Sequence, residues 1–203
     1  MNKFYQMPRM GIFMQEFLYP FKLHLGCGKK KIHGWINIDG NKEVEPDLVE
    51  DIFELPSFKP FTCSLIYFSH GPEHCPKNKT IEIFKLWHSL LYHGGILRVS
   101  VPDMAKVCED YVENRDLDIL SNFIHGSQRE SYGGLDIHYT SFDQKTLTKC
   151  LLDAGFSNVK EWDWRTTEPH AYIDDYSQAY LRGFGDKDKV NGKLMSLNLE
   201  AIK

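Results

Sequence analysis

Short apolar runs that alternate with longer amphipathic segments limit the fold of this chain more than any other feature of its sequence. Apolar runs bounded by glycine or polar residues are typical of strands that are buried on both faces. Strands are expected at residues 23–25, 35–39, 48–49, 64–69, 96–101, 159–164 and 194–202. Because helical segments separate several of these runs, most of the strands should be parallel.

Three segments between the expected strands have the periodicity of helices. From residue 79 to residue 92, apolar side chains recur at three- and four-residue spacing, and the glycines at 94–95 follow as a C-terminal stop. A second helix is expected to start at Met104, and a third to follow an N-cap at Asp143 and stop at Gly155. The predicted fold class is α/β: a Rossmann-like, doubly wound, mostly parallel seven-stranded sheet with an antiparallel closing strand and a shortened first helix.

The length of the chain indicates one domain. A chain of 203 residues is long enough for one hydrophobic core and short for two. We expect a single domain over residues 1–203, in which residues 1–21 form an N-terminal extension. Residues 165–193 contain a proline and several glycines, so they are expected to form a surface excursion with one helical turn. The glycines at 133–134 are expected to permit a mobile loop.

Net charge, hydropathy and cysteine spacing exclude several kinds of partner and site. A net charge of -4 supplies no positive field for phosphate backbones, so no nucleic acid partner is expected. No stretch reaches the roughly 18 uncharged apolar residues of a membrane span. The five cysteines form no C-x-x-C pair, which indicates neither a disulfide framework nor a thiolate zinc site. We expect a soluble, cytoplasmic protein and leave its oligomeric state open.

The turn Gly26-Cys27-Gly28 follows the first expected strand, where a bound ligand must approach the backbone closely. Lys31 stands where the dinucleotide fingerprint has its third glycine. Asp39 comes 11 residues after Gly28, whereas that fingerprint places its acidic residue about 20 residues on. The spacing leaves room for about one helical turn and favours a small cofactor without a pyrophosphate.

Several segments together resemble class I S-adenosylmethionine (SAM)-dependent methyltransferases over residues 22–163. The similar segments are His24-Leu25-Gly26-Cys27-Gly28, Gly34-Trp35-Ile36-Asn37-Ile38-Asp39, Asp51-Ile52 before Leu55-Pro56, Glu73-His74, and residues 94–103 (Gly-Gly-Ile-Leu-Arg-Val-Ser-Val-Pro-Asp). The resemblance implies SAM as cofactor and a small-molecule methyl acceptor, such as a sugar or a polysaccharide precursor.

The resemblance also implies a role for each matching residue. Gly26, Cys27 and Gly28 would lie against the methionine part of the cofactor, and Asp39 would hold the ribose. The adenine would be framed by Asp51 and Ile52, and the sulfonium would lie beside Ser69 and His70.

Histidines after the fourth expected strand carry two competing interpretations. A histidine can remove the proton of a methyl acceptor, and His70 is the first candidate, followed by His74 and His138. His70-Gly71-Pro72-Glu73-His74 also matches H-x-x-E-H, which binds zinc when both histidines share one face of a helix. Because glycine and proline inside the motif oppose a helix, no metal is expected.

Other interpretations of these residues stay open. Glu73 and His74 can instead cap or anchor the helix that follows them. The alternatives to a methyltransferase are a non-catalytic binding or interaction module on the same fold and a zinc hydrolase that uses His70, Glu73 and His74.

Overall fold

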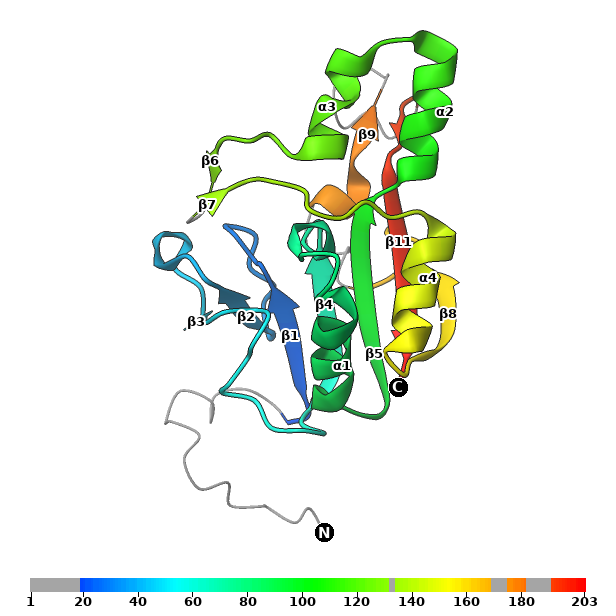
Figure 1. Ribbon diagram of the computed structural model, residues 1–203. Helices are drawn as coiled ribbons and strands as arrows, with labels where there is room; N and C mark the ends of the chain where they lie inside the picture. Colours follow the sequence, from blue (N-terminus) through cyan, green and yellow to red (C-terminus); the bar gives the residue numbers. More distant parts are fainter. Residues whose placement is uncertain (1–18, 132–133, 169–174, 182–190) are drawn as a thin grey trace.

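The computed structural model describes residues 19–131, 134–168, 175–181 and 191–203. The main sheet has seven strands in the order β3-β2-β1-β4-β5-β11-β8 (Figure 1). All its pairings are parallel except those of β11, which is antiparallel to both β5 and β8. The predicted fold class is therefore confirmed. The strands are β1 (Phe21–Leu25), β2 (Ile36–Asp39), β3 (Leu48–Val49), β4 (Cys63–Ser69), β5 (Leu91–Pro102), β8 (Ser157–Glu161) and β11 (Ser196–Ile202).

One face of the sheet is covered by helices. Along β4 successive side chains point to opposite faces, and Ile66 and Phe68 belong to the larger core on the helical side. Helices α1 (Thr80–Leu90) and α4 (Gln144–Asp153) pack here, and α1 contributes the fully buried Trp87. Asp143 is the N-cap of α4 with a capping box, as the sequence predicts.

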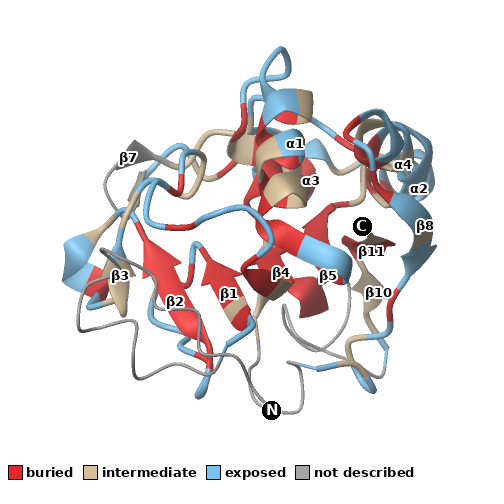
Figure 2. Cartoon of the chain, turned by 90° about the horizontal axis from the view of Figure 1, so that it is seen from below, coloured by how far each residue is buried: buried red, intermediate tan, exposed pale blue. Residues whose placement is uncertain are grey.

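The other face of the sheet carries a smaller aromatic cluster. Leu65 and Tyr67 of β4 lie here with Ile32, Trp35 and Trp162. These partners come from connecting segments, so residues outside the regular elements cover this face. Figure 2 shows the strands as the most buried layer of the molecule, with exposed residues concentrated on the helices and connections around them.

The connection from β1 to β2 contains turns and no helix, so the shortened first helix of about one turn that the sequence predicts is absent. One side chain, Asn37, replaces the missing helical hydrogen bonds. Its amide oxygen accepts from the Ile32 N–H at 2.7 Å, and its amide nitrogen donates to the Ile32 carbonyl at 3.1 Å and to the Trp35 carbonyl at 3.2 Å. Asp47 in turn accepts from Asn37. The short path to Asp39 is therefore held by buried polar contacts.

Several predicted boundaries are wrong. The helix expected over residues 79–92 ends at Leu90, and the glycines at 94–95 lie inside β5, where the backbone of Gly94 and Gly95 bonds to Lys203. Edge strand β8 starts two residues and ends three residues before the predicted bounds. Trp162, just past its end, still donates its N–H to the Asn198 carbonyl of β11 at 3.2 Å, and its ring lies in the aromatic cluster. Residue 194, expected in the last strand, instead lies in β10 (Lys193–Leu194) and pairs with β9 (Tyr180–Leu181).

Helices α2 (Met104–Asn114) and α3 (Leu117–His125) follow β5 (Figure 1). The start of α2 is predicted correctly, whereas α3 is missed, although its residues Leu117, Leu120 and Ile124 recur at three- and four-residue spacing. Residues 134–135 form β7 and pair with β6 (Glu130–Ser131). Of the predicted mobile loop, residues 132–133 lie outside the described residues and Gly134 lies in β7. Of the predicted extension over residues 1–21, residues 1–18 lie outside the described residues, and Phe21 begins β1.

Part of the segment expected to be a surface excursion is buried. The predicted helical turn is η4 (Tyr176–Gln178), and Ser177, Gln178, Tyr180 and Leu181 have little exposure. Leu181 packs with residues of α2 and α3 in a third small core. This packing explains why this part of the segment is buried. Residues 169–174 and 182–190 lie outside the described part of the chain. No helix among the described residues is long and apolar enough to cross a membrane.

Candidate functional site

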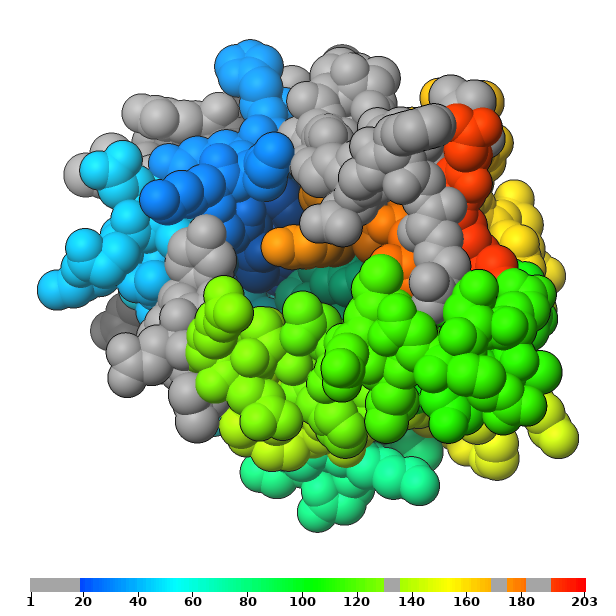
Figure 3. All heavy atoms as spheres, turned by 90° about the horizontal axis from the view of Figure 1, so that it is seen from above, coloured from blue at the N-terminus to red at the C-terminus, as the bar shows by residue number. Residues whose placement is uncertain are grey.

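The candidate site lies at the carboxyl ends of the parallel strands. The chain order of the strands reverses between β1 and β4, and in open α/β sheets ligands bind at such a reversal. Seen from this end, the molecule is hollowed between the residues that follow β1, the segment around α3 and the residues of η4, with β4 below (Figure 3). Apart from His138, which comes after β7, the predicted site residues end or follow β1, β2, β3 and β4, so the topology brings them to the same edge.

The glycine turn and Asp39 contact each other directly. Gly26 and Gly28 have φ of 59° and 50°, a conformation that glycine adopts without strain. The Gly28 N–H donates to Asp39 Oδ2 at 2.9 Å, and the Asn41 N–H donates to Oδ1 at 2.9 Å. The Asp39 side chain is nearly buried, yet each oxygen has a further lone pair for a ligand.

Cys27 does not supply a reactive thiol to this turn. Its backbone N–H donates to the Ile38 carbonyl at 3.1 Å, and its side chain is buried. Burial, together with the charges of Asp39 and Asp47, raises the pKa of the thiol to about 12. The contribution of Cys27 is therefore to join the ends of β1 and β2.

Asp51 and Ile52 follow β3 at the edge of the site. The Asp51 carboxylate is exposed, and its Oδ1 accepts from the Phe53 N–H at 2.8 Å. The carbonyl of Ile52 accepts from the Trp87 indole at 3.1 Å, which fixes this loop to α1. A methyl group placed on Gly26 would lie 3.8 Å from the Ile52 side chain, so the two predicted cofactor segments are neighbours.

His70, at the end of β4, is held by Ser196. The Ser196 hydroxyl donates to the Tyr176 carbonyl at 2.6 Å, so His70 Nε2, which lies 2.9 Å from Ser196 Oγ, must be the donor in that contact. The lone pair is then on Nδ1, 3.6 Å from Glu73 Oε1. Burial lowers the pKa of His70 to about 3. The imidazole is therefore neutral at pH 7 and weakly basic.

Glu73 is the most deeply buried acidic side chain of the site, with 1% exposure. Within the described part of the chain, neither of its carboxylate oxygens accepts a hydrogen bond. Burial raises the pKa of Glu73 to about 8. A buried carboxyl without hydrogen bonds costs stability, so its place here calls for a functional reason.

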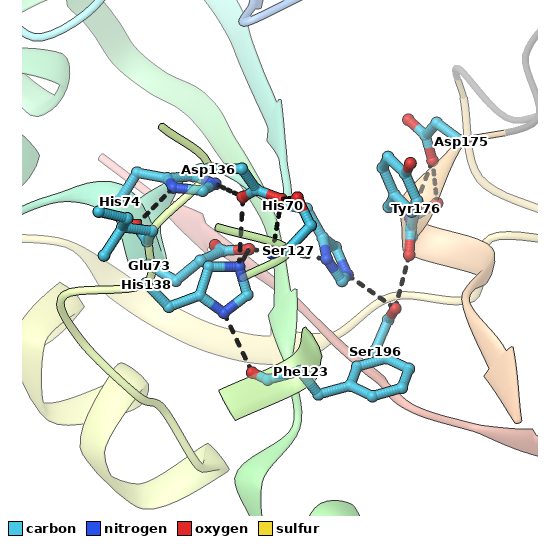
Figure 4. A network of polar contacts seen from close by, with 12 residues as sticks. His70, Glu73, His74, Phe123, Ser127, Asp136, His138, Asp175, Tyr176 and Ser196 are labelled. Carbon is cyan, nitrogen blue, oxygen red and sulfur yellow. Dashed lines mark hydrogen bonds and ion pairs between the residues drawn. The ribbon is translucent and has the colours of Figure 1, made fainter. Parts of the chain in front are cut away.

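His74 and His138 face Glu73 and Asp136 (Figure 4). His74 Nδ1 lies 2.9 Å from the Ile137 carbonyl, and His138 Nδ1 lies 3.1 Å from the Phe123 carbonyl. Asp136 Oδ1 lies 3.7 Å from His74 Nε2 and 4.0 Å from His138 Nε2. Burial lowers the pKa of His138, whereas hydrogen bonds from Ser127 outweigh burial and lower that of Asp136.

The H-x-x-E-H segment does not form the helical zinc motif. His70 has φ of 47° and only Pro72–His74 are helical, as the single 3₁₀ turn η3. The Nε2 atom of His70 faces Ser196, on the opposite side of the site from His74 (Figure 4). The expected effect of Gly71-Pro72 on the helix is thus confirmed, and His70 and His74 do not share one helical face.

The structure brings three predicted histidines, His70, His74 and His138, around one acidic residue. It adds partners that the sequence did not indicate, namely Ser127, Asp136, Tyr176 and Ser196. These residues lie in separate segments without a motif. Their side chains are common polar types, so only the folded chain identifies them.

Comparison with solved structures identifies the fold. A SAM-dependent methyltransferase from Archaeoglobus fulgidus is 17% identical, with a TM-score of 0.54 over 90% of this chain and 85% of that chain. One from Methanosarcina mazei is 16% identical, with a TM-score of 0.56 over 97% and 99%. One from Mesorhizobium loti is 13% identical, with a TM-score of 0.51 over 90% of each chain. This chain therefore has the fold of SAM-dependent methyltransferases.

Comparisons at the level of sequence add nothing to this likeness. No protein-family model matches the chain, and no curated protein sequence matches it.

Proposed function

We propose that the protein is an enzyme that transfers a methyl group from SAM to a small-molecule acceptor. The observation that carries the proposal is the contact between the Gly28 N–H and Asp39 at the reversal of strand order. It places a turn open to a ligand beside a carboxylate with free lone pairs. The fold shared with SAM-dependent methyltransferases supports the same function.

The residues of this edge fit an adenosyl cofactor. A methyl group placed on Gly28 would meet no atom within 4 Å, so the turn leaves open space on that side. We propose that Gly26, Cys27 and Gly28 hold the amino acid part, Asp39 the ribose hydroxyls, and Asp51 with Ile52 the adenine. Ser69 and His70 would lie beside the sulfonium, which when bound supplies an electrophilic methyl group.

The acceptor would lie beyond the end of β4, near the histidines. Methyl transfer requires the acceptor atom in line with the methyl carbon, and a hydroxyl or amine must also lose a proton. We propose His70 and His138 as the catalytic histidines. His70 is the weaker base, because burial makes its imidazole neutral and its free lone pair faces Glu73. His138 Nε2 holds a lone pair, because Nδ1 donates to the Phe123 carbonyl.

Calorimetric titration with S-adenosylhomocysteine tests the cofactor assignment. Asp39→Ala is expected to weaken binding by about tenfold or more, corresponding to about 1.4 kcal/mol. Asp39→Asn keeps the shape and should weaken binding less. Asp153→Ala, which removes an exposed carboxylate on α4, is the matched control and should bind like the unchanged protein. Absence of binding by the unchanged protein at millimolar ligand would refute the proposal.

A further inference from the structure

The cluster at the end of β4 has the donor atoms of a metal site. Glu73, His74 and His138 each offer one ligand atom, and these atoms lie within 4.8 Å of one another. The residues come from η3 and from the segment after β7, which are tied together because the Tyr139 and Thr140 N–H groups both donate to the Glu73 carbonyl. The cluster is therefore held by the fold rather than formed by loose surface side chains.

Hydrogen bonds orient His74 and His138 so that the Nε2 atom of each can bind a metal ion. A carbonyl oxygen only accepts, so the contacts of His74 Nδ1 with Ile137 and of His138 Nδ1 with Phe123 fix the proton on Nδ1 in each ring. Each Nε2 then presents a lone pair toward the centre of the cluster. Histidines that bind metals are commonly oriented in this way, by donation from the other ring nitrogen to a backbone carbonyl.

Two acidic residues, Glu73 and Asp136, lie beside the histidines. Asp136 Oδ2 accepts from the N–H and the hydroxyl of Ser127 at 2.9 and 2.6 Å, which leaves Oδ1 facing both histidines. Glu73 is an independent sign of a ligand, because it is 1% exposed and, among the described residues, has no hydrogen bond to either oxygen. Burying an unsatisfied carboxyl is costly, and a bound cation would remove that cost.

The distances suit a single ion. Bonds of about 2.0–2.2 Å allow two ligands of one ion to lie at most about 4.4 Å apart. Within the cluster, His138 Nε2 lies 3.9 Å from Glu73 Oε1. The widest pair of the cluster, at no more than 4.8 Å, needs an inward shift of only about 0.4 Å.

We propose that Glu73, His74 and His138 bind a divalent transition-metal ion such as Zn²⁺, with Asp136 beside the two histidines. Two imidazoles favour such an ion over Mg²⁺ or Ca²⁺, which prefer oxygen ligands throughout. His74 and Asp136 are 31% and 29% exposed, so the ion would be buried on the side of Glu73 and open toward solvent at the hollow. An open position can take an oxygen of another molecule.

The role of this ion rests on the proposed function, whereas the site itself does not. With the ion bound, the Nε2 lone pair of His138 is a metal ligand and does not accept a proton. An acceptor hydroxyl bound to the ion is more acidic than a free one and loses its proton to water. The oxygen lone pair then forms the bond to the methyl carbon, and the pair of the broken carbon–sulfur bond stays on sulfur. The acceptor class is therefore a molecule with a metal-binding hydroxyl, which includes the sugars that the sequence resemblance implies.

Titration of chelator-treated full-length protein with Zn²⁺, and with Co²⁺ to observe visible absorption, tests the site. The unchanged protein should bind one ion per chain. His138→Ala should weaken binding by about 100-fold or more. His93→Ala, which removes an exposed histidine near the start of β5, should leave binding unchanged. Lack of stoichiometric binding by the unchanged protein, or unaltered binding by His138→Ala, overturns the proposal.

The Glu73→Gln variant tests whether Glu73 is a metal ligand or has only a structural role. It also tests the metal site if His138→Ala does not fold. Without metal, this variant should melt at or above the temperature of the unchanged protein, because a buried carboxyl is removed. With Zn²⁺, it should lose the rise in melting temperature that the unchanged protein shows. An equal rise in both proteins overturns the proposal. Binding of S-adenosylhomocysteine by the metal-free protein is measured separately, so failure of the metal site and failure of the methyltransferase function are distinguished.

Discussion

Single residues at the end of β4 set the shape of the candidate site. The Phe68 ring packs between the glycine turn after β1 and the backbone of Gly71. It thereby connects the proposed cofactor segment with the segment that carries Glu73 and His74. Small residues at both contacts let the ring approach the backbone, so the position of the histidines depends on glycine as much as on any charged group.

Gly71→Ala is therefore expected to destabilise the protein. The added methyl group would lie 1.7 Å from the Phe68 ring, which is buried and has no room to withdraw. Overpacking of this kind costs about 1–3 kcal/mol or more. Urea unfolding measures the change, and Gly40→Ala is the control, because its nearest neighbour would be the Glu50 carbonyl at 3.9 Å. Equal stability of the two variants would contradict the packing described for Phe68.

At the scale of elements, the sequence predicts the strands and helices with strong local patterns. Strand β3, the core of β4 and the cap of α4 are where apolar runs and Asp143 place them. Helix α3 is missed although its apolar residues have helical spacing. The start of β5 is missed because a glycine pair was expected to end a helix, whereas here Gly94 and Gly95 bond to Lys203 far along the chain. This long-range pairing decides where β5 begins, and local periodicity does not reveal it.

The same limit applies to the site. Asp39 follows from its spacing after the glycine turn, and the histidines were candidates because of their chemistry. The partners Asp136 and Ser127 come from a segment without a motif, and only contacts between that segment, α3 and η3 bring them to Glu73. The sequence therefore indicates the proposed cofactor side of the site better than the proposed acceptor side.

Strands β5 and β11 are joined by an ion pair whose effect depends on pH. Arg98 Nε lies 2.8 Å from Glu200 Oε2, with the two side chains 12% and 10% exposed. Burial raises the pKa of Glu200, but the hydrogen bond and charge of Arg98, with Lys160, outweigh it and lower the pKa below 4.5. A lowered pKa stabilises the folded state at pH values above 4.5, and this contribution is lost as the pH falls through the folded pKa.

Glu200→Gln is expected to lower the free energy of unfolding at pH 7 by about 1–3 kcal/mol. The difference from the unchanged protein should shrink as the pH is lowered from about 5 toward 3, because the unchanged protein then protonates Glu200. Urea unfolding at several pH values measures both effects. Lys160→Gln is the matched control and should change stability less, since Lys160 is 65% exposed. A difference that does not vary with pH would contradict the ion pair.

At the scale of the whole molecule, the candidate site lies between two apolar cores. The main core fills the space between the sheet, α1 and α4, and a smaller one joins Val107, Leu120, Leu181 and Met195 of the segments beyond the carboxyl ends of the strands. Helices α2 and α3 and strand β9 stand above the ends of β4 and β5 (Figure 1). A ligand in the hollow of Figure 3 would contact residues attached to both cores.

Cofactor binding should therefore stabilise the whole chain against unfolding. A ligand at about 100 times its Kd adds about 2.7 kcal/mol when it binds only the folded state. For a chain of this length, that free energy corresponds to a rise in melting temperature of about 5–10 °C. S-adenosylhomocysteine should produce this rise, whereas NAD at the same concentration should not, because the short step from Gly28 to Asp39 leaves no helix to receive a pyrophosphate. A rise with NAD, or none with S-adenosylhomocysteine, would show that the glycine turn binds a different kind of nucleotide or none at all.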